Sequence, residues 1–216
     1  MAYVAGMTGH APLHLIDIGS AAGLNLLFDR YFLDYGRLSW GDESSKVRLS
    51  CELIGETEPP LNGWRPQICH RIGVDLNPID LADARESRWL RALVWPDRPG
   101  WAAALDGAME IVRRDPPAIL AGDAVTLLPG LLREVSEGET PCLLCSYVLE
   151  YFPEESRSRF RQVLDEFGAG RDLYLIEMSG VGERAGVGLN SWRSGAYELV
   201  HLAQCQPHGQ SLRWLS

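Results

Sequence analysis

Residues 13–26 constrain the fold of this chain more than any other part of the sequence. An apolar run that carries one acid, Asp17, ends at Gly19 and gives way through small residues to a helical pattern. A strand, a tight turn and the beginning of a helix, in this order, let a ligand lie close to the backbone. The sequence therefore predicts an α/β fold with a ligand site at its first strand-to-helix turn.

The spacing of the small residues in this turn distinguishes two kinds of ligand. A dinucleotide site needs glycines at the first, third and sixth positions counted from Gly19, and the sixth position holds Leu24. A sulfonium-nucleoside site needs small residues at the first, third and fifth positions and an acid two residues before the first. Gly19, Ala21 and Gly23 occupy those three positions. Asp17 lies at the position of the acid, so the second pattern fits better.

In these residues the chain resembles the class I S-adenosylmethionine-dependent methyltransferases, whose first motif reads acid-x-Gly-x-Gly-x-Gly. Ala21 departs from that motif, and we expect its methyl group to be tolerated if the backbone angle there is ordinary. The longer string of residues 18–31, together with residues 74–78, is similar to an uncharacterised bacterial domain family beside these enzymes. The resemblance covers most of the chain. It implies a Rossmann-like fold whose mostly parallel, doubly wound sheet carries a C-terminal antiparallel hairpin.

Strand and helix patterns alternate along most of the chain, which is typical of a parallel sheet covered on both faces. The helix after the glycine-rich turn is predicted to continue to Tyr35. Strands are predicted at 71–76, 118–121, 142–148 and 173–178, helices at 85–95, 101–112, 127–134 and 154–167, and a closing hairpin at 196–204 and 210–215. Asn190 and Trp192 fall in a predicted glycine-rich loop before that hairpin.

Residues 37–66 interrupt this alternation. Val47 and Leu49 alternate with polar residues at the period of a half-exposed strand, and Trp40 precedes a polar turn at residues 41–45. We therefore predict a β-hairpin inserted after the first helix. A chain of 216 residues without internal repeats is predicted to form a single domain over residues 1–216.

The composition limits the partners of the chain. A formal charge of −9 argues against a nucleic-acid partner, which needs a basic face, and favours a small molecule. The sequence has no membrane-length apolar run, and its first twelve residues lack the features of a signal peptide. Five cysteines favour reduced thiols in the cytoplasm, with Cys142 and Cys145 on opposite faces of a core strand. The five histidines have no metal-ligand spacing, so we expect no metal.

Three acids fall at the carboxyl ends of the first three predicted strands, where open α/β sheets bind ligands. The resemblance implies that Asp17 orients the methionine amino group, Asp75 accepts both ribose hydroxyls and Asp123 contacts the adenine amino group. Alternatively, Asp75 caps the turn at residues 77–78, and Asp123 is the N-cap of the next helix. The residues expected to bind S-adenosylmethionine are Asp17, Gly19, Ser20, Ala21, Gly23, Asn25, Asp75, Leu76, Asp123, Ala124 and Ser146.

The catalytic candidates follow the fourth predicted strand, in residues 146–153. This segment resembles the asparagine-valine-leucine-histidine stretch of small-molecule methyltransferases, with Glu150 where a histidine often stands. Glu150 could be a general base, or it could cap the next helix or pair with an arginine. Tyr147 and Tyr151 could shape the pocket or pack in the core. A base is not mandatory, because alignment of the reactants alone can contribute ~7–11 kcal/mol.

The sequence favours an S-adenosylmethionine-dependent methyltransferase that acts on a small-molecule acceptor. In the alternative interpretation, the chain keeps the nucleoside pocket but serves as a non-catalytic sensor or interaction protein, since the role of Glu150 is open. A nicotinamide-dependent dehydrogenase comes third, because Leu24 occupies the sixth position of the dinucleotide pattern.

Overall fold

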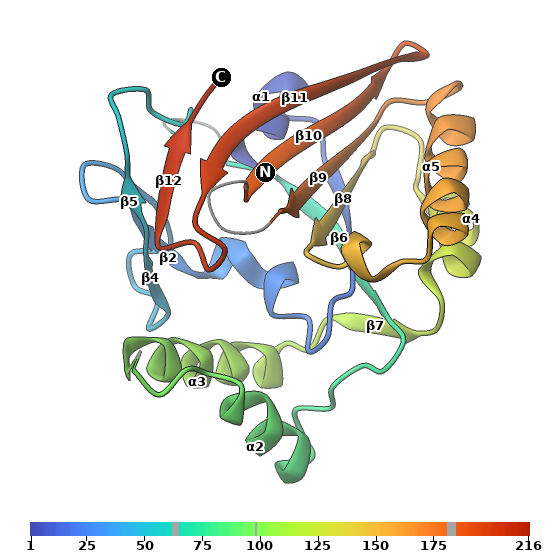
Figure 1. Cartoon of the computed structure of the whole chain (residues 1–216). Helices are drawn as coiled ribbons and strands as arrows, with labels where there is room; N and C mark the ends of the chain where they lie inside the picture. Colours follow the sequence, from blue (N-terminus) through green and yellow to red (C-terminus); the bar gives the residue numbers. More distant parts are fainter. Residues whose placement is uncertain (62–64, 98, 181–184) are drawn as a thin grey trace.

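Figure 1 shows the computed structural model of the chain, which describes residues 1–61, 65–97, 99–180 and 185–216. Its largest element is a nine-stranded sheet. From one edge to the other, the strands are β5 (Glu52–Leu53), β12 (Ser211–Trp214), β11 (Ala196–Cys205), β10 (Gly186–Arg193), β9 (Leu173–Ser179), β8 (Thr140–Ser146), β1 (Leu13–Ile18), β6 (Ile68–Asp75) and β7 (Ala118–Ala121). The predicted α/β class is confirmed, with a sheet that is larger than the sequence indicates.

Five neighbouring strands form the parallel half of this sheet, in the order β7-β6-β1-β8-β9. They are the five strands that the sequence predicts, with their ends displaced by a few residues. The direction of chain progress reverses at β1, because β6 and β7 extend the sheet to one side and β8 and β9 to the other. In open sheets of this kind, ligands bind beyond the carboxyl ends of the strands at the point of reversal. The turn at residues 19–23 lies at that point.

Beyond β9, the strands β10, β11 and β12 continue the sheet with antiparallel pairing. The hairpin of β11 and β12 confirms the predicted C-terminal hairpin. The predicted glycine-rich loop is wrong, because Asn190 and Trp192 lie within β10. Gly186 and Gly188 lower the β propensity of this segment. Tertiary contacts outweigh that effect, since Trp192 is buried in the core and its indole N–H donates to the Asp165 carboxylate at 2.7 Å.

Helices cover both faces of the sheet, with α4 and α5 stacked on one of them (Figure 1). The helices are α1 (Ala2–Met7), α2 (Ala84–Ala92), α3 (Pro99–Arg114), α4 (Ala124–Glu134) and α5 (Glu154–Gly168), with the 3₁₀ helices η1 (Leu24–Arg30) and η2 (Leu149–Tyr151). Leu128 of α4 and Leu164 of α5 pack in one core cluster with Ile16 and Leu143 of the sheet. Val4 of α1 belongs to a second cluster. None of the described helices has the length and apolar composition of a membrane span.

The two cysteines of the CxxC sequence lie on β8 and belong to different core clusters, as predicted. Cys145 packs in the cluster that contains α4 and α5, and Cys142 packs in the cluster that contains α1. Burial raises the pKa of the Cys142 thiol to about 12, because burial disfavours the thiolate. All five cysteines of the chain are free. The pair therefore fills the core rather than forming a disulfide.

The helix predicted after the glycine-rich turn is wrong in kind and in length. The chain forms the 3₁₀ helix η1 and then turns into the strand β2 (Phe32–Asp34). Within η1, Leu27 has non-helical dihedral angles, with φ −110° and ψ 22°. The Phe32 N–H donates to the Val47 carbonyl oxygen at 2.9 Å, so pairing with a distant segment overrides the helical spacing of the apolar residues.

The insertion forms a small three-stranded sheet rather than the predicted hairpin. β2 lies at its centre, with β3 (Ser39–Gly41) antiparallel on one side and β4 (Arg48–Ser50) parallel on the other. The two segments predicted to pair therefore flank a strand that the sequence assigns to a helix. The strand β5 leaves the insertion and pairs with β12 at the edge of the large sheet. Residues 62–64 of the predicted insertion lie outside the described residues.

Candidate functional site

The turn that follows β1 strongly favours glycine at two of its positions. Gly19 and Gly23 have φ values of +75° and +74°, in the left-handed region that disfavours residues with a Cβ atom. Space is also limiting. A Cβ atom at Gly19 would lie 2.6 Å from the Val148 side chain, and one at Gly23 would lie 2.7 Å from Pro117. The turn therefore packs tightly against the segments that follow β8 and precede β7.

Ala21, between these glycines, also has a left-handed backbone, with φ +49°. The condition under which we expect its methyl group to be tolerated, an ordinary backbone angle, is therefore not met. For an L-residue with a side chain, this conformation costs roughly 1–2 kcal/mol. The backbone is held in place because the Ala21 N–H donates to Asp75 Oδ2 at 2.8 Å and its carbonyl oxygen accepts from the Ile79 N–H at 3.1 Å. Strain of this kind persists where surrounding contacts over-determine it.

Asp17 is the most deeply buried acid of this region, with 1% of its surface exposed. Its Oδ2 has no hydrogen-bond partner, and neither has the buried hydroxyl of Ser20, three residues further on. Burial raises the pKa of Asp17 from 3.8 to about 7, and the nearby charge of Asp75 adds to the effect. A buried acceptor without a donor is costly, so this carboxyl group is suited to a ligand that brings a donor or a positive charge.

Asp75, at the end of β6, accepts hydrogen bonds from the glycine-rich turn and from the turn that follows β6. Its Oδ2 accepts from the Ala21 N–H and its Oδ1 from the Asn77 N–H, both at 2.8 Å. The predicted turn-capping alternative is therefore observed at Asn77, together with an anchoring bond to the glycine-rich turn that the sequence does not indicate. Each carboxylate oxygen can accept a second hydrogen bond, so Asp75 keeps capacity for ligand hydroxyls.

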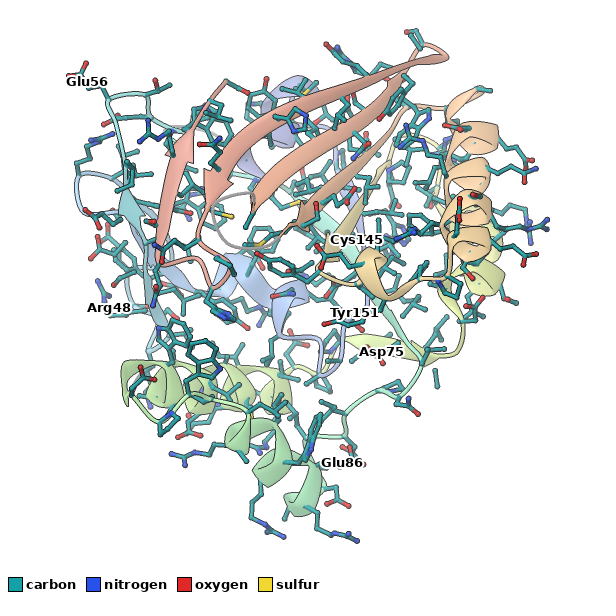
Figure 2. All side chains as sticks on the ribbon, viewed as in Figure 1. Arg48, Glu56, Asp75, Glu86, Cys145 and Tyr151 are labelled. Carbon is teal, nitrogen blue, oxygen red and sulfur yellow. The ribbon has the colours of Figure 1, made fainter. Side chains whose placement is uncertain are left out.

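A cleft of about 190 Å³ opens at the carboxyl ends of β1, β6 and β7. Six of the predicted site residues line it: Gly19, Asp75, Leu76, Asp123, Ala124 and Tyr151. Figure 2 shows that the labelled Asp75 and Tyr151 lie in the same region, below the lower ends of the strands. Leu76 and Tyr151 are exposed apolar side chains, with 69% and 82% of their surface accessible. Exposed apolar groups around a cleft are typical of a binding site.

Asp123 is the N-cap of α4, as the alternative interpretation expects. Its Oδ1 accepts from the backbone N–H and from the hydroxyl of Thr126, both at 2.8 Å. Because Asp123 also lines the cleft, the capping role and a ligand contact through its second oxygen are compatible.

Of the catalytic candidates, Glu150 is exposed, and its Oε1 accepts from the Gly180 N–H at 2.6 Å. It binds the backbone that follows β9 and does not line the cleft. Tyr147 has a left-handed φ of +58°, and its buried hydroxyl has no partner. Burial raises the pKa of Tyr147, and the neighbouring Cys205 and Glu150 add to the effect. A strained residue directly after β8 is a further mark of a functional region.

Other predicted site residues lie outside the lining of the cleft. Asn25 is exposed on η1, and the Ser146 hydroxyl lies 3.9 Å from the sulfur of Met178. Asp17, Ser20, Ala21 and Gly23 belong to the turn and its strand but do not line the cleft. Seven further residues that line the cleft were not predicted: Ile18, Val74, Gly122, Val148, Phe152, Pro153 and Ser156. They lie at the ends of β1 and β6 or follow β7 and β8, so their position at the carboxyl ends of strands could have indicated them.

Comparisons with known proteins identify similar solved structures and one family. No protein among the curated sequences matches the chain. The sugar N-methyltransferase KedS8 from Streptoalloteichus sp. is similar over 93% of this chain and 67% of its own, with 10% identity and a TM-score of 0.31. At that TM-score, the similarity carries no argument about fold or activity. Residues 1–214 match the family described as "Uncharacterized protein conserved in bacteria (DUF2332)", and the chain therefore belongs to this family.

Proposed function

We propose that the chain is an S-adenosylmethionine-dependent methyltransferase that acts on a small-molecule acceptor in the cytoplasm. The observation that carries the proposal is the cleft at the point where the sheet reverses. It lies between the glycine-rich turn and two acids, Asp75 and Asp123, that end neighbouring strands. Ligands of open α/β sheets bind at this place. The motif in the turn favours a sulfonium nucleoside over a dinucleotide.

The buried carboxyl group of Asp17 suits the positive charges of this cofactor. S-adenosylmethionine carries an ammonium group and a sulfonium group, and Asp17 Oδ2 is a buried acceptor without a partner. A positive charge nearby would favour the ionised form of Asp17 and relieve the cost of burying it. Asp17 lies directly before Ile18 and Gly19, which line the cleft. The unpartnered acceptor of Asp17 therefore fits a cofactor that carries positive charge.

Five other residues that line the cleft contribute to the proposed complex. Gly19 lets the cofactor approach the backbone, and Asp75 has acceptor capacity left for the ribose hydroxyls. The apolar lining from Val148 and Phe152 suits the adenine ring, with Asp123 in reach of its amino group. When bound, the cofactor supplies an electrophilic methyl group.

Among the catalytic candidates, the geometry favours positioning over proton transfer. Glu150 Oε1 accepts from the Gly180 N–H, so Glu150 holds the backbone after β9, away from the lining of the cleft. The hydroxyl of Tyr147 is buried and Tyr147 does not line the cleft, whereas Tyr151 is exposed at the cleft and can contact an acceptor molecule. We therefore expect the protein to align its acceptor and exclude water rather than to act through a strong base.

The second candidate function is a non-catalytic sensor that binds the same nucleoside. One observation favours it, namely that Glu150 is bonded to the backbone and does not line the cleft. Binding of the cofactor without methyl transfer to any member of a broad acceptor panel would favour the sensor over the enzyme.

Calorimetric titration of the purified chain with S-adenosylmethionine, S-adenosylhomocysteine and NADH tests the proposal. We expect both sulfur nucleosides to bind, and the variants Asp17→Asn and Asp75→Asn to bind them at least tenfold more weakly. Asp106→Asn is the matched control, because Asp106 pairs with Arg91 on the surface of α3 and lies outside the cleft. Binding of NADH alone would reassign the site to a dehydrogenase, and binding of none of the three would refute the proposal.

A further inference from the structure

Three side chains with metal-binding atoms converge at the end of the sheet opposite to the cleft. His14 is near the start of β1, His70 lies in β6, and Glu139 directly precedes β8. The Nδ1 atoms of His14 and His70 lie 3.2 Å and 3.1 Å from the two carboxylate oxygens of Glu139. One ligand atom from each residue lies within 4.8 Å of the others. These positions are far apart in the sequence, which is why their spacing predicts no metal site.

A bulge in β6 brings His70 to this place. Leu13 is opposite Ile68, whereas His14 is opposite His70, so Cys69 is an extra residue in β6. Bulges are uncommon between parallel strands, and they re-aim side chains. Here the bulge sets the imidazole ring of His70 against that of His14, with 5.0 Å between the ring centroids. Without it, the residue opposite His14 would be Cys69.

The distances within the cluster agree with those between ligands of one metal ion. Zinc bonds of ~2.1 Å at tetrahedral angles place the ligand atoms ~3.4 Å apart. The two distances from imidazole nitrogen to carboxylate oxygen, 3.2 Å and 3.1 Å, are only slightly shorter. Two imidazoles and one carboxylate are a donor set that zinc accepts, and it leaves one position for water.

Exposure and charge also suit a metal ion. The side chains of His14 and Glu139 are 11% and 15% exposed, whereas that of His70 is 58% exposed, which leaves a path from solvent. The carboxylate of Glu139 lies between the two imidazole rings, and its negative charge favours a cation at this place.

We propose that His14, His70 and Glu139 bind a zinc ion, with water as the fourth ligand. The ion would join β1 and β6 to the segment before β8. From His14 to Gly19 the chain advances five residues along β1, or ~17 Å at the rise of a strand. At this distance from the cleft the ion stabilises the fold and takes no part in chemistry at the glycine-rich turn. The proposal is independent of the proposed function.

The test is a titration of the chelator-treated full chain with ZnCl₂, followed by calorimetry and by the thermal midpoint. We expect one zinc ion per chain. At a free zinc concentration of ~100 times the Kd, linkage predicts that the midpoint rises by about 5–10 °C. The variants His70→Ala and Glu139→Gln should bind zinc at least ~100-fold more weakly. Because His70 is exposed, its substitution should leave the fold intact.

His201→Ala is the matched control, because it removes an exposed imidazole of β11 that is not part of the cluster. This variant should bind zinc as tightly as the wild type and show the same rise of the thermal midpoint. If the wild-type chain binds no zinc, or if His70→Ala and Glu139→Gln bind it as tightly as the wild type does, the proposal is wrong.

Discussion

Substitution of Asp17 by Asn should make the stability of the protein less dependent on pH. Burial raises the pKa of Asp17 from 3.8 to about 7 in the folded chain. The folded state therefore holds a proton that the unfolded state releases between these values. The stabilising effect of that proton is complete below pH 3.8 and is lost as the pH rises to about 7. The amide of Asn does not titrate, so the variant does not lose this stabilisation as the pH rises.

The magnitude of the effect follows from the pKa shift. Each pKa unit corresponds to ~1.4 kcal/mol, so the titration of Asp17 removes about 3 kcal/mol between pH 5 and pH 8. In a chain of this length, 1 kcal/mol moves the thermal midpoint by about 2–4 °C. The midpoint of Asp17→Asn relative to the wild type should therefore rise by about 6–12 °C from pH 5 to pH 8.

Thermal unfolding of both proteins over this pH range, followed by circular dichroism, measures the difference. Groups that titrate in both proteins cancel in the comparison, and so does any loss of packing that is independent of pH. Asp106→Asn, at an exposed ion pair, should keep a constant offset from the wild type. If the offset of Asp17→Asn is equally constant, Asp17 ionises normally in the folded chain, and the argument for a cationic ligand loses its basis.

Three further predictions concern the same turn. If S-adenosylmethionine binds with Asp17 ionised, calorimetry should show affinity rising up to ~10-fold per pH unit below pH 7 and levelling off above it. Ala21→Gly should relieve the left-handed strain and, after the entropic cost of glycine, raise the free energy of unfolding by about 0.5–1 kcal/mol in denaturant titrations. Gly23→Ala should lower it by about 1–3 kcal/mol in the same assay, because its Cβ would meet Pro117, and a neutral effect would contradict the observed packing.

The parallel half of the sheet could be predicted from the sequence because its signals are local. Strands such as β7 are short apolar runs between helical patterns, and the Gly19 turn carries its own spacing. The C-terminal hairpin was also predictable, since two alternating segments flank a polar turn. Features of this kind depend on residues that are neighbours in the sequence.

The errors concern features that are set by distant parts of the chain. Phe32 has helical spacing to its neighbours, but its N–H pairs with Val47. The backbone angle of Ala21 depends on the hydrogen bond that its N–H donates to Asp75, 54 residues away. The bulge that aligns His70 with His14 exists only between two assembled strands. No window of the sequence contains both partners of these contacts, so pattern and propensity could not reveal them.

The pairing of β5 with β12 has a consequence for how the protein is made. Glu52 lies opposite Ser211, so this border of the sheet closes only after residue 211 has left the ribosome. Until then, the segment around residue 52 has no docking place on the sheet. Once formed, the two-residue β5 shields part of β12, whose free backbone groups could otherwise pair with another molecule. A protein that is truncated before residue 211 lacks β12, which leaves the edge of β11 unpaired, and it should therefore be prone to aggregation.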